Sequence, residues 1–180
     1  LVGSEMCIRD RNISLEEAFA GKNLPISFEV NGQARNIAVN IPAGVQHGTR
    51  LRYQGYGDRS INNLPPGDLF VIVSVNDHAV FRRDGPHLHM NLKLDAIAAI
   101  LGAKREITTI DGMQIAVNIP AGTQHGAILR VASHGMPLHN NARQRGDMFI
   151  AVNIVIPKDL TDEHVIQLKT IAQQRGEPTT

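Results

Sequence analysis

A long internal repeat constrains this chain more than any other feature of its sequence. Residues 37–52 read IAVNIPAGVQHGTRLR and residues 115–130 read IAVNIPAGTQHGAILR, so thirteen of sixteen positions are identical at an offset of 78. A shorter match follows in the same order, since GDLF at residues 67–70 corresponds to GDMF at residues 146–149. Two copies are too few for a solenoid, but each is long enough for a small domain with its own core. The sequence therefore predicts two tandem domains of one fold.

Each repeat begins with a short predicted helix. Ser14 and Glu17 form a capping box, in which the two side chains satisfy backbone N–H groups at the start of the helix. Gly21 follows at the position where a left-handed residue ends a helix. Asp95 and Gly102 stand at the corresponding positions of the second repeat, where they predict the N-cap and the stop.

Runs of alternating apolar residues after each helix predict β-strands. In the first repeat the expected strands cover residues 26–30, 37–41, 51–53 and 69–75, with Asn31-Gly32 as the tight turn of a hairpin. In the second repeat they cover residues 107–110, 113–119, 128–131 and 148–156. The predicted fold class is mainly β: two tandem small β-sandwich-like domains, each with one short helix, followed by a C-terminal amphipathic helix.

A final helix is predicted from Asp162 to about Arg175, with Thr161 as its cap. Its apolar residues share one face, and because the helix lies outside the two domains, another surface must cover that face. They are Val165, Leu168, Ile171 and Ala172. Packing back onto the second domain would cover this face, and so would pairing with a second copy of the chain. We expect pairing, so that the helix forms a homodimer.

The repeat and the helix together predict the domain boundaries. Residues 1–11 have no clear period and no relation to the sequence that follows, so we expect a non-native leader outside the fold. The remaining expected boundaries are a first domain over 12–77, a hinge over 78–85, a second domain over 86–157, and the dimerisation helix with its tail over 158–180.

Composition excludes several classes of function. The formal net charge of +1 comes from 18 basic and 17 acidic residues without a dense basic cluster, which disfavours a general nucleic-acid binder. The single cysteine, Cys7, leaves no internal disulfide or Cys-rich zinc site and is typical of a reducing cytoplasm. No apolar stretch reaches the roughly 20 residues that span a bilayer, so no membrane partner is expected.

The chain also lacks the sequence motifs of catalysis and cofactor binding. There is no GxSxG elbow, Walker loop or dinucleotide glycine fingerprint, so we expect neither an enzyme nor a cofactor. His87 and His89 share a face of a predicted strand, but no third ligand has a spacing suited to a metal ion. His47 and His125 recur inside the same turn of the two repeats, which indicates a structural role in that turn.

Several motifs in this order resemble the C-terminal region of DnaJ-type co-chaperones. The first repeat opens with ISLEEAFAGK at residues 13–22 and continues with the IPAG turn at residues 41–44. The connector HAVFRRDG at residues 78–85 is similar to the family's HPxFxRxG hinge, with Ala79 in place of the proline. LGA, IDG, GMP and RGDM motifs match the second domain of the family. The resemblance covers about residues 12–175.

Other features of such proteins are not found in this sequence. It has no His-Pro-Asp tripeptide of a J-domain, no Gly/Phe-rich linker before Ile13 and no CxxCxGxG zinc repeats. The chain is therefore most similar to the C-terminal half of the zinc-less class, which includes the bacterial curved-DNA-binding protein. The resemblance implies two β-domains and dimerisation through the C-terminal helix.

The resemblance also implies that the chain binds unfolded client polypeptides and passes them to a DnaK-type ATPase. Carried over to this sequence, the client groove of the first domain is lined by Ile26, Phe28 and Phe70, with Ile13 as a weaker candidate. The alternative is that these four side chains fill the core. An exposed strand edge beside such a groove can accept an extended peptide as an additional strand.

The acidic tail of the ATPase partner is implied to bind near Lys22 and Arg35, although isolated cations are more often simply solvated. Two other functions compete with client binding: DNA binding, and a structural dimerising spacer without affinity for clients. A steep dependence of affinity on salt is the signature of the DNA hypothesis, which is not favoured. Its candidate contacts are Arg50, Arg52, Arg82, Arg83, Arg143 and Arg145.

Overall fold

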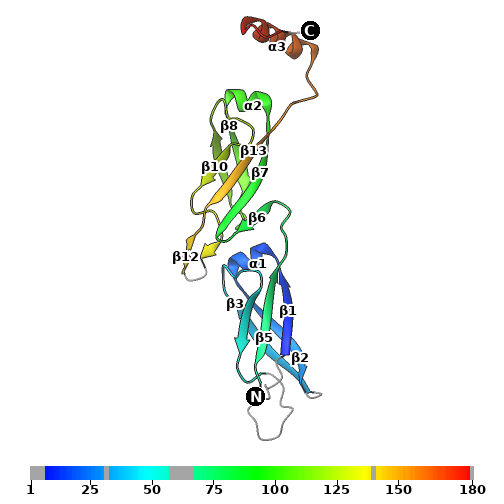
Figure 1. The fold of residues 1–180 in the computed structure, drawn as a ribbon, viewed down its shortest axis with the longest axis vertical. Helices are drawn as coiled ribbons and strands as arrows, with labels where there is room; N and C mark the ends of the chain where they lie inside the picture. The colour runs from blue at the N-terminus through cyan, green and yellow to red at the C-terminus, as the bar shows by residue number, and fades with distance from the viewer. Residues whose placement is uncertain (1–6, 31–32, 57–66, 139–140, 179–180) are drawn as a thin grey trace.

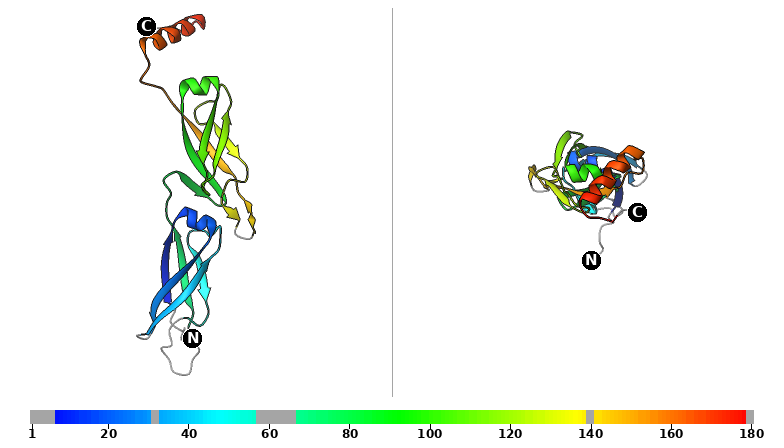
Figure 2. Two further views of the ribbon diagram at one scale, coloured as in Figure 1. Left: turned by 180° about the vertical axis from the view of Figure 1, so that it is seen from behind. Right: turned by 90° about the horizontal axis from the view of Figure 1, so that it is seen from above.

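The computed structural model describes residues 7–30, 33–56, 67–138 and 141–178, and in them the chain is mainly β. Two small β-domains lie end to end, with a C-terminal helix beyond the second (Figure 1). Seen along its long axis, the molecule is narrow and the two domains lie one behind the other (Figure 2). The predicted fold class is confirmed.

The described residues of domain I form two sheets and one short helix. Its elements are β1 (Cys7–Ile13), α1 (Leu15–Ala20), β2 (Lys22–Val30), β3 (Gln33–Ile41), β4 (Thr49–Tyr53) and β5 (Leu69–Val75). The three-stranded sheet has the order β1-β5-β4, in which β1 runs parallel to β5 and β4 antiparallel to it. β2 and β3 form a separate antiparallel hairpin. α1 lies at the end of the domain that faces domain II (Figure 1).

Domain II repeats this arrangement. Its elements are β6 (Phe81–Asp84), β7 (His87–Asp95), α2 (Ala96–Leu101), β8 (Ala103–Thr108), β9 (Gln114–Ile119), β10 (Ile128–Val131), β11 (Pro137–Leu138), β12 (Asn141–Arg145) and β13 (Met148–Val155). The sheet order β10-β13-β7-β6 contains the same parallel central pair, β13 with β7, and β8 pairs with β9. β6 and the β11-β12 hairpin are the parts of domain II that approach domain I (Figure 1).

The structure corrects the prediction that all of residues 1–11 lie outside the fold. Residues 7–11 belong to β1, which pairs with β5 along its whole length. A strand pairs through its main chain, and any residue except proline supplies that pairing. The pairing therefore leaves the origin of the segment untested, and a non-native origin remains a prediction.

The connector between the domains is shorter than predicted. The expected hinge covered residues 78–85, but β6 lies within it and pairs with β7 of domain II. Only residues 76–80 therefore link the two sheets. The predicted turn at Asn31-Gly32 lies outside the described residues.

The caps of the two short helices are confirmed. Ser14 and Glu17 exchange both bonds of the capping box, each at 3.1 Å. The Asp95 side chain accepts from the N–H of Ile97 at 2.8 Å, and Gly102 ends α2. Gly21 ends α1 with φ of +75° and ψ of +156°, so it adopts a region open essentially to glycine alone rather than the left-handed helical region.

One hydrophobic core runs through the contact between the domains. It includes Val71 of domain I and Leu88 and Ile150 of domain II, all with fully covered side chains. A smaller cluster around Leu94 and Val152 lies in domain II. The prediction of a separate core for each domain is therefore wrong, because the domains bury apolar side chains against each other.

The turn after β3 packs directly against domain II. Gly44 has φ of +79°, and a Cβ at this position would lie 2.3 Å from the carbonyl oxygen of Pro137 in β11. Val45, the next residue, is completely buried. The guanidinium of Arg83 in β6 donates to the carbonyl oxygens of Gly44 at 2.8 Å and Val45 at 2.6 Å. Domain II therefore holds this turn by close packing and by hydrogen bonds.

Arg145 of β12 makes the second polar contact of the seam. Its guanidinium lies over the ring of Phe19 in α1, 4.7 Å from the ring centroid, and forms an ion pair with Asp111 at 2.7 Å. Burial raises the pKa of Asp111, but hydrogen bonds from Thr109 and Arg145 outweigh it, so this pKa lies below its ordinary value. A cation facing an aromatic ring and a carboxylate links α1 to domain II.

The C-terminal helix α3 (Asp162–Gln174) has the predicted cap at Thr161, whose side chain accepts from the N–H of His164. No residue of α3 is fully buried. Packing of α3 back onto domain II is therefore not the arrangement in this structure.

Among the described residues, no helix is long and apolar enough to cross a membrane.

Replacing Gly44 by alanine tests the close approach at the seam. A Cβ in a left-handed conformation costs about 1–2 kcal/mol by itself, and Gly44→Ala adds a collision with the main chain of Pro137. Gly122→Ala is the matched control, because Gly122 has φ of +77° at the equivalent position and no heavy atom within 4 Å of the place that a Cβ would occupy. The midpoint of urea unfolding should fall further for Gly44→Ala, and equal shifts would contradict the packing.

Replacing Arg145 by methionine tests the polar contact. Methionine preserves apolar packing on Phe19 but leaves the Asp111 carboxylate without its cation, so we expect a loss of about 2–3 kcal/mol in the free energy of unfolding, somewhat below the loss for a fully buried pair. Arg130→Met is the control, because Arg130 pairs with Asp147 while its own side chain is 66% exposed. Its removal should change urea unfolding by less than about 1 kcal/mol. Similar losses in both variants would refute a special role for Arg145.

Candidate functional site

Two of the predicted groove residues lie inside the core. The side chains of Ile13 and Ile26 are 1% and 0% exposed and belong to the core shared by the two domains. A client therefore reaches them only if the edge of the domain opens. Phe28 lies two residues further along β2, but its side chain is outside the described residues. The client-binding role of these three residues remains a prediction.

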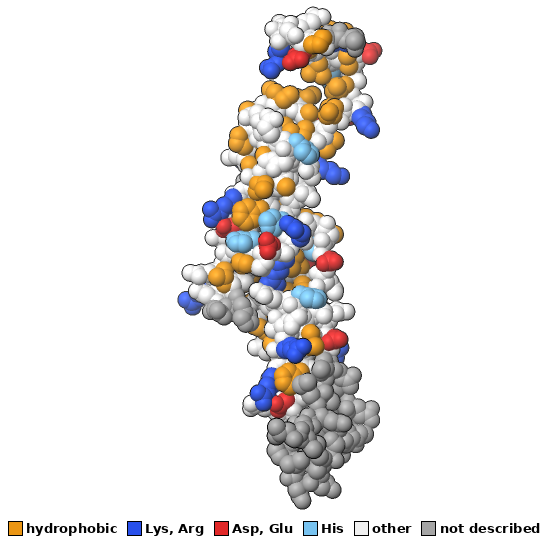
Figure 3. Space-filling view, viewed as in Figure 1, with side chains coloured by type: hydrophobic (Ala, Val, Ile, Leu, Met, Phe, Trp, Pro, Cys, Tyr) orange, Lys and Arg blue, Asp and Glu red, His pale blue; other side chains and the backbone are white. Residues whose placement is uncertain are grey.

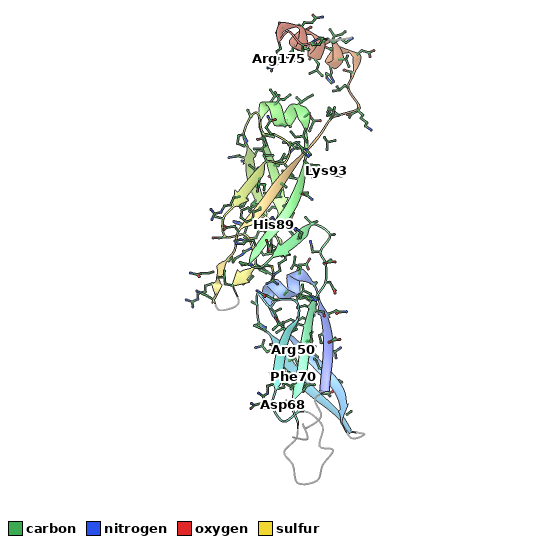
Figure 4. The ribbon with its side chains drawn as sticks, viewed as in Figure 1. Arg50, Asp68, Phe70, His89, Lys93 and Arg175 are labelled. Atoms are coloured by element: carbon green, nitrogen blue, oxygen red, sulfur yellow. The ribbon has the colours of Figure 1, made fainter. Side chains whose placement is uncertain are left out.

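Phe70 faces away from that core. Buried and partly exposed residues alternate along β5, and Phe70 is one of the partly exposed ones, so it points to the side of the sheet opposite the core. Arg52 of β4 lies beside it in the register and forms an ion pair with Asp68 at 2.6 Å. Figure 4 shows Phe70 and Asp68 near each other in domain I. The structure therefore does not bring Phe70 together with Ile26.

The hairpin of β2 and β3 leaves one edge of β2 without a partner among the described strands. Pro25 lies in the middle of β2 and has no N–H to donate to a ladder. Proline is tolerated in a strand where its nitrogen faces an unpaired edge, so we infer that the nitrogen of Pro25 faces away from β3. Main-chain groups alternate along a strand, so those of Asn23 and Ser27 face the same edge. Both residues are exposed. This edge has the geometry to accept an extended peptide.

The equivalent edge in domain II is protected by charge. β8 carries Lys104, Arg105 and Glu106 in succession, and all three are exposed. Charged side chains along an edge discourage the addition of another strand. β2 carries no charged side chain from Asn23 to Phe28. The edge of β2 is therefore the better acceptor of the two.

The cations predicted to bind an acidic tail are only partly described. Lys22 forms an ion pair with Glu17 of α1, and the hydrogen bond from Lys22 is the main cause of a lowered pKa of the Glu17 carboxyl. An exposed pair of this kind contributes only about 0–1 kcal/mol, so an acidic ligand can compete for Lys22. The side chain of Arg35 is outside the described residues, and the tail-binding role stays a prediction.

A hollow of about 910 Å³ lies where domain I meets the connector. Leu15, His78 and Phe81 are among the residues that line it. The Nδ1 atom of His78 accepts from the N–H groups of Val80 and Phe81 at 3.1 and 3.0 Å, and its Nε2 lies 3.1 Å from a Glu16 carboxylate oxygen. The histidine at the start of the hinge motif thus fixes the connector. The sequence analysis assigned no role to His78, although its place at the start of the hinge motif was a signal that it has one.

The arginines of the DNA hypothesis divide into two groups. Arg52, Arg83 and Arg145 are engaged in the ion pairs and carbonyl contacts described above. Arg50, Arg82 and Arg143 are exposed. Half of the proposed contacts therefore serve the fold, and the structure adds no support for a phosphate-binding surface.

The repeated histidines have the structural role predicted for them. His47 and His125 each accept a main-chain hydrogen bond from the last strand of their own domain. His87 also accepts one, from the N–H of Asp147, and His89 stacks on Phe149. Within the described ranges there is no group of three or more residues that could hold a metal ion.

Apolar side chains are exposed at the end of domain II that carries α2. Figure 3 shows them gathered there and on the neighbouring α3. Ile100 and Leu101 of α2 are 65% and 73% exposed. The predicted dimerisation residues Val165, Leu168 and Ile171 are also exposed, and Ala172 is partly so. Two apolar surfaces are thus exposed, on α2 and on α3, and the sequence pattern indicated only the second.

The fold and site define a protein of two tandem β-domains with an open strand edge in the first and an apolar surface beyond the second. Comparison with known proteins identifies its family. The family model described as the DnaJ C terminal domain matches residues 9–157. The chain belongs to this family.

Relatives with this region are named as chaperones. The chain is 42% identical over 129 residues to the "Chaperone protein DnaJ" of Bartonella quintana (strain Toulouse), which covers 72% of this chain and 34% of the relative. It is 40% identical over 152 residues to the protein of the same name from Gloeobacter violaceus (strain ATCC 29082 / PCC 7421), covering 82% and 39%. The chain therefore spans little more than a third of the length of these curated relatives.

Proposed function

We propose that this chain is the client-binding part of a co-chaperone, which binds extended apolar segments of unfolded polypeptides for transfer to a DnaK-type ATPase. Membership of the DnaJ C-terminal family and the names of the relatives support a chaperone role. The structural observation that carries the proposal is the edge of β2, which has no partner among the described strands and no charged side chain from Asn23 to Phe28. The role requires neither catalysis nor a cofactor, and its expected location is the cytoplasm.

A client strand added to β2 would bind mainly through its main chain. Such bonds are the same for any sequence, which suits a protein with many clients. Pro25 interrupts the row of donors, so the added ladder is short. Each buried apolar side chain of the client contributes at most about 1.5–3 kcal/mol, and the costs of association offset much of this gain, so we expect an affinity no tighter than micromolar. Binding of this strength is readily reversible.

The apolar side of β2 packs into the core beside this edge. Leu24 is partly buried against the core, and Ile26 is fully buried in it. The alternation of apolar residues continues in the sequence to Phe28. Because Ile26 is fully covered, its role is to shape the floor rather than to contact the client in the closed domain. Phe70 lies on the other side of the β1-β5-β4 sheet, so it defines a separate surface.

We also propose that two copies pair through α3 and the exposed end of domain II. Phe19 of α1 and Ile100 of α2 occupy the same position in the two repeats. Phe19 is covered by Arg145 of domain II, whereas Ile100 has no such cover. A second copy offers the apolar face of its α3 as that cover. Two client edges in one dimer raise the overall affinity for a long unfolded chain without any new contact.

Ser27→Pro tests the edge of β2. Proline removes a donor from the unpaired edge but leaves the ladder with β3 in place, so we expect suppression of aggregation of a chemically denatured model protein to fall several-fold. Glu106→Pro is the matched control, because Glu106 occupies in β8 the position of Pro25 in β2. Light scattering measures aggregation, and circular dichroism verifies that each variant is folded.

The pattern across variants distinguishes the hypotheses. Loss in Ser27→Pro alone supports client binding at β2. Loss only in Phe70→Ser would move the client to the outer face of the β5 sheet and contradict the β2 site. No suppression by the unaltered chain would refute client binding by this chain and favour the spacer hypothesis.

Ile100→Asp tests the dimer. We expect the molar mass from light scattering at tens of micromolar to fall from two copies to one, because a carboxylate cannot be buried against α3 without a large desolvation penalty. Leu168→Asp should have the same effect, because Leu168 lies on the apolar face of α3 that would cover Ile100 of the second copy. Val80→Asp is the control, since Val80 is 52% exposed but lies in the connector between the domains. A monomeric unaltered chain, or a dimer in both variants, would disprove the interface.

A further inference from the structure

Two histidines at the same place in the repeats clamp the last strand of each domain. The Nδ1 atom of His47 accepts from the N–H of Val75 at 3.2 Å, and that of His125 accepts from the N–H of Ile154 at 3.1 Å. The glycine after each histidine donates to the same strand two residues earlier, at 2.8 Å in both domains. Each turn therefore grips the strand with one donor and one acceptor.

Both clamps lie where the chain leaves a domain. Val75 is the final residue of β5, and the connector to domain II follows it directly. Ile154 is the second-last residue of β13, which continues into the segment that leads to α3. The two histidines thus fix the starting points of the two links that set the positions of domain II and α3.

We propose that His47 and His125 are proton-sensitive clamps, which release the ends of β5 and β13 when the imidazole becomes protonated. An imidazole nitrogen accepts a hydrogen bond only while it carries no proton, and in the imidazolium both nitrogens are donors. Histidine is the side chain whose ordinary titration falls between pH 5 and 8. The clamp bond is present while Nδ1 carries no proton, and it is lost when Nδ1 gains one.

The surroundings of His47 do not replace the lost bond. Asp77, His78, Arg82 and Arg83 line the same hollow, and no carboxylate is within hydrogen-bonding distance of His47 among the described residues. The carboxylate of Glu16 in α1 contacts His78 of the connector and not His47. The carbonyl oxygen of Val75 lies 3.4 Å from Nδ1 of His47. Protonation can redirect Nδ1 to that oxygen, but the N–H of Val75 still loses its acceptor.

The surroundings of His125 are similar in kind. The register places Lys93 of β7 beside Asn153 and Asp95 beside Val155, so these are the charged groups on the neighbouring strand. The described hydrogen bonds join neither of them to the imidazole of His125. The same chemistry therefore applies to both domains.

Amide hydrogen exchange of the full chain measures the clamps directly. After correction for the intrinsic exchange rate, we expect the protection of the Val75 and Ile154 amides to fall about three- to tenfold between pH 7.5 and pH 5.5, the effect of one hydrogen bond. In His47→Asn the side-chain amide oxygen provides an acceptor that does not titrate. Protection of Val75 should then be independent of pH, while that of Ile154 keeps its pH dependence. His125→Asn should give the reverse pattern.

Nitrogen chemical shifts of the imidazole rings in the unaltered chain test the same point without a substitution. At pH 7.5 the shifts should show Nδ1 of both histidines without a proton. A protonated Nδ1 at that pH, or protection of the two amides that is the same at both pH values, would overturn the proposal. So would a pH response of Val75 that persists in folded His47→Asn.

Discussion

The packing of the Gly44 turn against Pro137 sets the relative position of the two domains. Two arginines of domain II reinforce it, Arg83 through the carbonyl oxygens of the turn and Arg145 through the ring of Phe19. Guanidinium groups suit this task because they supply several donors in a fixed plane and also stack on aromatic rings. The edge of β2, the connector and the end that carries α3 all take their places from this seam.

The two repeats share a fold but differ in what surrounds them. Gly44 and Gly122 have nearly the same φ, yet only Gly44 touches another domain. Phe19 is covered at the seam, while its counterpart Ile100 is open. Duplication of a domain thus produces one end that is covered within the chain and another that is available for assembly. The strand edges diverge in the same way, because β8 is charged where β2 is neutral.

The candidate site was predictable only in part. The resemblance implied groove roles for Ile26 and Phe70, but neither the alternation along residues 26–30 nor the continuous apolar run at 69–75 tells which face of a strand is covered. The structure places Ile26 in the core and Phe70 on the opposite side. The roles of Arg83 and Arg145 were also out of reach, because their partners are carbonyl groups and a ring that the fold brings near from distant parts of the chain.

The sequence by itself determined the repeat, the mainly β fold class, the helix caps and the paired histidine turns, because these depend on neighbours within a few residues or on direct comparison of the two copies. Ser14 with Glu17, and the recurrence of His47 as His125, are examples. Only the tertiary structure decided that β1 pairs with β5, that the cores merge and that the end of α2 stays open. Those features depend on contacts between distant segments, and such contacts leave no periodic trace in the sequence.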